Sequence, residues 1–181
     1  MIGNIAAGLY GVGVTPSTSS YESIASASGT GSSGTITFDL TGVTGYKHLQ
    51  IRYLSKNTAS GTDAYIQFNS GTDSVRRHQL LGDGSAAGGS SNAGTAYILL
   101  TSGSSGSSMY GVGVIDILDY TSTTKAKTVR CLSGYDLNGS GLVGLGSALW
   151  TSTSAITDIS IKSAGTNFDS NTRYALYGIK D

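Results

Sequence analysis

Charged side chains, cysteine and histidine are scarce in this 181-residue chain, and each scarcity excludes a class of protein. Charged residues make up 12% of the chain, and 11 Lys and Arg balance 11 Asp and Glu. Because that share is about half the usual one and the formal net charge is zero, we expect no binding of nucleic acid or of an anionic membrane. The single cysteine, Cys131, cannot form a disulfide within the chain, and two histidines alone cannot build a common zinc site.

Long apolar runs are also missing. No run approaches the roughly 18 residues of a membrane span, and the first basic residue is Lys47, so we expect neither a transmembrane helix nor a secretory signal. Small residues are abundant instead, with 29 Ser, 21 Thr and 27 Gly. These residues favour strands, turns and loops over helix interiors, which excludes an all-helical protein.

From Tyr21 onward, short apolar stretches alternate with Gly, Ser, Asn and Asp clusters. In the clearest strand, Ile36, Phe38 and Leu40 share one face while polar residues occupy the other. The strand candidates are 34–40, 46–56, 64–69, 76–81, 95–101, 109–118, 124–133, 142–150, 155–163 and 172–180. We therefore predict an all-β body over residues 21–181, an antiparallel two-sheet sandwich that is jelly-roll-like.

The segments between these strands read as turns and loops. Low-complexity stretches at 26–34, 82–94 and 101–108 predict surface loops. Asn138-Gly139 suits the positive φ angles of a type I′ turn and predicts a hairpin between its flanking strands.

Residues 1–20 predict an extended N-terminal arm that precedes the body. The segment has no charged side chain and mixes four glycines with isolated apolar residues. A disordered terminus is the alternative, but the apolar residues are unusual for pure disorder. We expect an assembly interface made of Ile2, Ile5, Leu9, Tyr10, Val12 and Val14. The pentapeptide YGVGV occurs in the arm at 10–14 and again at 110–114, and we attribute the repeat to chance in so Gly-rich a chain, because nothing around the two copies matches.

No constellation for catalysis emerges from the reactive side chains. The Gly-x-Ser-x-Gly elbow is absent, His48 and His78 read as surface or interface residues, and Cys131 reads as a small buried hydrophobe rather than a reactive thiol. Two Gly-x-Gly-x-x-Gly matches do not open a helix in a βαβ unit, so they do not predict a phosphate cradle. We predict no enzyme activity and no cofactor.

Acidic residues offer two weaker alternatives. Residues 136–141 have the oxygen spacing of the first half of a calcium loop. Such a loop closes with Glu, however, and Ser147 stands at that position. We therefore favour a hairpin turn over a weak cation site and predict no metal. Asp116 and Asp119 lie three apart in an extended segment and should diverge. Their expected partners are Lys125, Lys127 or Arg130.

Aromatic residues raise the question of carbohydrate, because jelly-roll domains often bind sugars through exposed rings. Tyr65, Tyr110 and Trp150 are candidate contacts for a glycan or a partner, although Tyr and Trp also pack sandwich cores.

Several strings, read in order, resemble a known group of proteins. They are YKHLQIR (46–52), HQLLGDG (78–84), VIDILDYTSTTKAKTVR (114–130), LWTSTSAITDISI (149–161) and RYALYGIK (173–180), with MIGNIAAG and STSSYESIA near the start. The chain resembles small structural proteins of tailed bacteriophages of aquatic bacteria, including cyanophages.

The resemblance implies a component of the virion surface with no known activity and a jelly-roll-like body. We expect a capsid decoration or cement protein that binds other virion proteins, such as the major capsid protein, as a homotrimer. The alternative is a tail- or fibre-associated protein that binds a receptor or host glycan.

Overall fold

The computed structural model describes residues 19–59, 63–71, 74–95, 98–101, 108–136 and 140–180. Within these ranges the only helix is one short 3₁₀ turn, η1 (Asn69–Gly71). The strands are β1 (Tyr21–Ser28), β2 (Thr35–Asp39), β3 (His48–Ser55), β4 (Asp63–Phe68), β5 (Val75–Gly82), β6 (Ala87–Thr95), β7 (Ile98–Thr101), β8 (Gly111–Ile117), β9 (Lys127–Asp136), β10 (Gly141–Trp150), β11 (Asp158–Ser163) and β12 (Arg173–Ile179).

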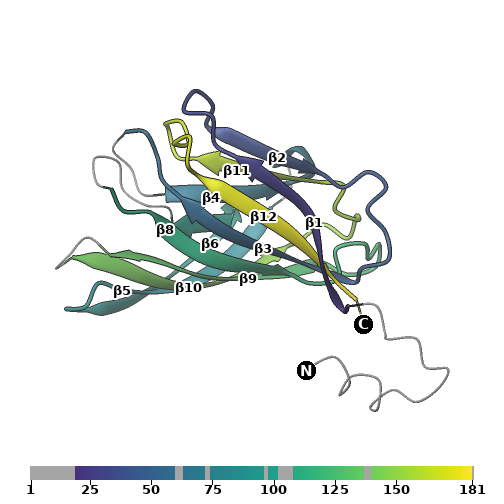
Figure 1. Cartoon of the computed structure of the whole chain (residues 1–181). Coiled ribbons are helices and arrows are strands. Elements are labelled where there is room, and N and C mark those ends of the chain that lie inside the picture. The colour runs from purple at the N-terminus through teal and green to yellow at the C-terminus, as the bar shows by residue number, and fades with distance from the viewer. Residues whose placement is uncertain are drawn as a thin grey trace, which may run out of the picture.

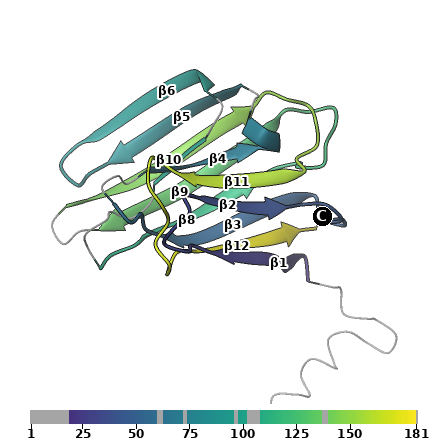
Figure 2. The same cartoon turned by 90° about the horizontal axis from the view of Figure 1, so that it is seen from above.

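These strands form two antiparallel sheets packed face to face, which confirms the predicted all-β sandwich. The larger sheet has the order β1-β12-β3-β8-β9-β10-β5-β6, and the smaller has the order β2-β11-β4-β7. Figure 1 shows the two layers, and in Figure 2 strand β6 lies at one flank of the larger sheet and β1 at the other. The chain end lies beside the start of β1, where the Lys180 amide donates to the Ser20 carbonyl at 2.9 Å.

The core is made of the inward residues of both sheets. The predicted inward residues of three strands are all buried, as shown by Phe38, Ile51 and Ile66, which are 4% exposed or less. On β8 the inward Gly113 leaves room for the ring of Tyr53 on β3, since an added Cβ there would lie 2.5 Å from that ring. Apolar burial of this kind is the main stabilising contribution to such a sandwich.

Two predicted loops are partly strands. Residues 82–94 were expected to form a loop, but Ala87–Thr95 is strand β6, which pairs with β5 from Gly82↔Ala87 to Val75↔Thr95. Residues 26–28 complete β1, which pairs with β12. Backbone pairing holds these segments in place although their Gly- and Ser-rich sequences carry no alternating pattern.

The predicted Asn138-Gly139 turn lies outside the described residues. The strands on its two sides are antiparallel neighbours whose register runs from Asp136↔Gly141 to Lys127↔Trp150. Residues 102–107 of the predicted loop at 101–108 are likewise outside the description.

Lys127 corrects one predicted pairing. Its side chain is fully buried, and its Nζ lies within hydrogen-bonding distance of the carbonyls of Ser122 (2.5 Å), Lys125 (3.0 Å) and Thr153 (2.8 Å), and of that of Ser154, so its three N–H groups are shared among four acceptors. The ammonium therefore ties together the β8–β9 and β10–β11 connections instead of pairing with an aspartate.

The predicted divergence of the two aspartates assumed an extended segment, but β8 ends at Ile117 and Asp119 has a positive φ of 51°. Asp119 pairs with Lys125 at 3.1 Å. Asp116 lies opposite Arg130 in the strand register, and its Oδ1 accepts a hydrogen bond from Gln50 at 2.8 Å.

Candidate partner-binding face

The outer face of the larger sheet, which is turned away from the smaller sheet, carries a band of exposed aliphatic side chains. Alternation along each strand places them there, because their neighbours in sequence point into the core. Six residues on five adjacent strands make up this apolar band: Leu54 on β3, Val112 on β8, Leu132 on β9, Val143 and Leu145 on β10, and Leu80 on β5.

Strand register makes the band continuous. One row runs from Leu54 through Val112 and Gly134 to Val143. The neighbouring row runs from Leu132 to Leu145 and Leu80. Their side chains are 40% to 59% exposed. Single exposed apolar residues are ordinary, whereas a contiguous group marks a surface that binds something.

Two shallow hollows are sunk into this face. The larger, of about 480 Å³, is bordered by Arg52, Val112, Leu132, Gly134 and Val143. Gly134 forms part of its floor because it adds no side chain between Val112 and Val143. The second hollow, of about 300 Å³, lies farther along the band and is bordered by residues that include Leu80, Leu145 and Arg130. Hollows of this kind can accept side chains that protrude from a partner.

Arginine is the basic residue of this face. Arg52, Arg76, Arg130 and Arg173 are all exposed and point outward from strands of the larger sheet, and no lysine occupies an outward position of those strands among the described residues. Arginine and apolar residues are enriched in protein interfaces, whereas lysine is depleted. The face therefore has the composition of a protein contact surface with a positive margin.

A cluster at the edge of the band holds one of these arginines in place. The rings of Tyr21 and Tyr177 stack with centroids 4.9 Å apart, and the Arg52 guanidinium lies 5.3 Å and 5.6 Å from them. Arg52 Nε also donates to Gln50 Oε1 at 3.0 Å, and Tyr21 Oη donates to the same oxygen at 2.5 Å. Burial raises the pKa of Tyr21, so this hydroxyl stays a donor at neutral pH. The cluster presents the guanidinium in a fixed orientation beside the apolar band.

The sequence-predicted contacts do not come together. Trp150 is 1% exposed and packs edge-on against Phe68, which corrects its assignment as a surface contact. Tyr65 lies half-buried on β4 of the smaller sheet. Tyr110 precedes β8, and its hydroxyl donates to Asp169 at 2.9 Å. The arm residues Ile2, Ile5, Leu9, Tyr10, Val12 and Val14 lie outside the described residues.

Cys131 and His48 both have defined surroundings within the fold. Cys131 is buried on the inward face of β9, and burial raises the pKa of its thiol to about 11. His48 Nδ1 accepts a hydrogen bond from the Asp119 amide at 2.9 Å. In the described ranges no three His, Cys, Asp or Glu residues gather in a way that could hold a metal, and no helix is long and apolar enough to cross a membrane.

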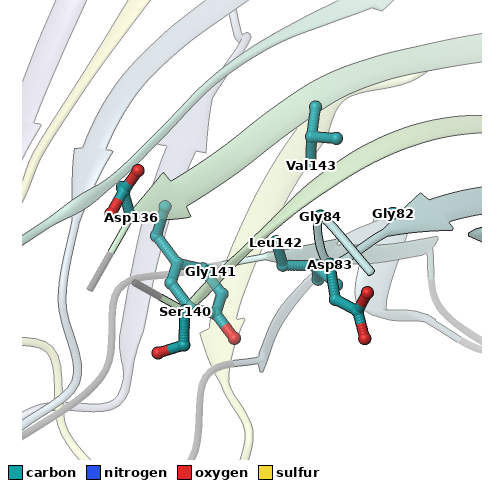
Figure 3. Close-up of a pocket in the computed structure, with 9 residues that line it drawn as sticks. Gly82, Asp83, Gly84, Asp136, Ser140, Gly141, Leu142 and Val143 are labelled. Atoms are coloured by element: carbon teal, nitrogen blue, oxygen red, sulfur yellow. The ribbon is translucent and has the colours of Figure 1, made fainter. Parts of the chain in front are cut away.

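A third hollow, of about 350 Å³, separates the ends of the β5–β6 and β9–β10 hairpins and includes residues of the predicted cation turn. Figure 3 shows Asp136 and Asp83 on opposite sides of it. The Asp83 carboxylate accepts the amides of Ala86 (2.7 Å) and Ser85 (2.9 Å), and these hydrogen bonds lower its pKa. Asp83 thus stabilises its own turn.

Comparison with known proteins gives no relative: no family model, no curated protein and no solved structure matches this chain.

Proposed function

We propose that this protein is a non-enzymatic structural subunit of a bacteriophage virion, a decoration or cement protein that binds the outer surface of the head as a trimer. The observation that carries the proposal is the arginine-margined apolar band on the larger sheet. We name the phage head as the partner because the sequence resembles phage structural proteins.

The band has enough uncovered apolar surface to contribute to binding. Its five most exposed members, Leu80, Val112, Leu132, Val143 and Leu145, are 52% to 59% exposed. Completing the burial of each contributes about 1 kcal/mol, and all five contribute about 5 kcal/mol before the entropic cost of association. One such contact is modest, but three linked contacts in a trimer would act together through their high effective concentration.

The charges of the face indicate the chemistry of the partner. The guanidinium groups of Arg52 and Arg130 border the hollows. Arginine forms its strongest hydrogen bonds with carboxylates. The head surface recognised here would therefore present aliphatic side chains together with Asp or Glu.

The strand order supports a jelly roll as the finer description of the fold. Without the hairpins β5–β6 and β9–β10, the remaining strands pair as β1-β12-β3-β8 and β2-β11-β4-β7. Successive strands of this set change sheets except at the β4–β7 hairpin, as in the double Greek key of viral capsid domains. In this description the two extra hairpins widen one sheet and supply β9, β10 and β5, three of the five strands that carry the apolar band.

The glycan-binding alternative receives less support. It depended on exposed aromatic side chains, and Trp150 is buried while Tyr65 and Tyr110 lie on different parts of the fold. A glycan array probed with the whole protein discriminates the two functions, because a head-binding protein gives no signal.

The direct test is binding to purified heads that lack the protein. Leu132→Glu places a carboxylate in the centre of the band, and we expect it to abolish occupancy. Thr37→Glu is the matched control, because Thr37 is exposed on the outer face of the smaller sheet. Equal occupancy for both variants, with both folded by circular dichroism, would contradict the proposal.

A further inference from the structure

Strand β6 is a long edge strand with little of the usual protection against pairing. It is nine residues long, carries no charged residue or proline, and ends the larger sheet. Its pairing with β5 is irregular only at its end, beyond Ala93, so Ala87 to Ala93 form a regular seven-residue edge. Ala87 to Ala93 are exposed on both faces. Natural proteins protect such edges with charges, prolines, bulges or short strands, because the free amides and carbonyls otherwise recruit another strand.

The other edge strands do carry such devices. Strand β1 has an irregularity in its register between Ser23 and Ala25, and it includes Glu22. Strand β2 is five residues long and includes the exposed Asp39. Strand β7 is four residues long. The contrast singles out the regular part of β6, Ala87 to Ala93, as the edge that remains available to a further strand.

The chain contains a second copy of a sequence that already forms a strand in this sheet. In β8 the last four residues of YGVGV, 111–114, point Gly111 and Gly113 inward and Val112 and Val114 outward. The same five residues occur at 10–14. As a strand, that segment would place its valines on one face and its glycines on the other.

Geometry rules out pairing of this segment with β6 of its own chain. Residues 15–18 are the four residues that separate it from the described body, and they span at most about 14 Å. The body begins beside β1, and the eight-stranded order puts seven strand spacings, or about 34 Å, between β1 and β6. Only a second copy can bring its β6 within reach.

We propose that residues 9–15 of one copy add as a further strand along the free edge of β6 in a second copy. Val12 and Val14 then lie on the outer face, where Gly89 of β6 stands opposite Leu80 and leaves space beside it. The added strand extends the apolar band across the boundary between copies. The affinity comes from main-chain hydrogen bonds together with these side chains.

The arrangement makes each copy both a donor and an acceptor. The arm leaves from the β1 edge and the acceptor is the opposite edge, so the contact is head to tail. A head-to-tail contact forms a closed ring when the rotation between successive copies closes. That such a ring has three copies follows only from the trimer in the proposed function. The pairing of the arm with β6 does not depend on binding to heads.

Cysteine cross-linking between two differently tagged full-length chains tests the pairing. One chain carries Val12→Cys, and the other carries a cysteine in place of one outward residue of β6: Gly89, Ser91 or Ala93. Inward controls replace Gly88, Ser90 or Asn92, and an edge control is Ser26→Cys on β1. The native Cys131 is buried and does not interfere.

We expect mild oxidation to link Val12→Cys to at least one outward β6 position, and to give only monomer with the inward and β1 controls. Cross-linking to Ser26→Cys, to the inward positions alone, or to no β6 position would overturn the proposal. A full-length chain that stays monomeric in sedimentation at all concentrations would also overturn it.

A second pair of variants separates this inference from the proposed head binding. Deletion of residues 1–18 should convert the associated protein to monomer. Leu132→Glu should leave the β6 cross-link unchanged, even where it abolishes binding to heads. Self-association that persists after the deletion contradicts the strand pairing but leaves head binding by the apolar band intact.

Discussion

Removing the buried ammonium of Lys127 should destabilise the protein far more than removing the ammonium of its neighbour Lys125. Lys127 is fully buried, and its Nζ is bonded to four backbone carbonyls and lies 5.4 Å from the Trp150 ring centroid. Lys127→Met keeps the aliphatic stem but leaves those carbonyls without their donor. Each buried acceptor that loses its partner costs about 1–3 kcal/mol, although some will turn toward water.

We therefore expect Lys127→Met to lower the free energy of unfolding by about 3–5 kcal/mol. With a urea m-value of about 2–3 kcal/mol/M, the unfolding midpoint should fall by about 1.5 M. Lys125→Met is the control, since this side chain is 65% exposed and pairs with Asp119 at the surface. An exposed pair contributes less than about 1 kcal/mol. A midpoint for Lys127→Met no lower than that of Lys125→Met would refute the role of the ammonium as a tie between the two connections.

Two further predictions concern titratable groups. The Cys131 thiol should resist alkylation at pH 8 until urea unfolds the protein, because burial raises its pKa to about 11 and keeps it protonated; rapid labelling of the folded protein would show that β9 opens. Stability should also fall in acid. The pKa of Glu22 is lowered chiefly by its hydrogen bond from Lys180, and that of Asp119 by its hydrogen bond from Lys125. Because these carboxyl groups have lower pKa values in the folded protein than in the unfolded chain, their ionised forms stabilise the fold above about pH 4. That contribution is lost as the pH falls through the folded pKa values. Burial raises the pKa of Asp63 and opposes the trend, but more carboxylates are shifted down than up. The urea midpoint should thus be lower at pH 3 than at pH 7, and an equal or higher midpoint at pH 3 would contradict the account.

The inward faces of several strands could be predicted from sequence because apolar and polar residues alternate there. Ile36 and Phe38 on β2, and Ile66 on β4, illustrate this pattern. Strand β6 could not be found in the same way, because AGGSSNAGT has no alternation and is ordered by pairing with β5.

The apolar band could not be predicted from sequence, because the sequence does not show which residues of β9 and β10 point outward. In β9 and β10, apolar residues occur at both parities, so Cys131 faces inward and Leu132 outward, while Trp150 faces inward and Leu149 outward. Sequence alone does not decide which parity is buried. The apolar band becomes visible only when the register aligns outward residues from five strands. A signal was present in LVGLGSALW, where apolar residues occupy both faces of one strand, a pattern typical of a strand that is covered on both faces.

A reconstruction of the virion by electron cryomicroscopy tests the central claim most directly. It should show the larger sheet against the head, with Leu132 and Leu145 covered by the capsid protein and the smaller sheet facing solvent. Density that placed the apolar band in solvent, or the protein away from the head, would contradict the account.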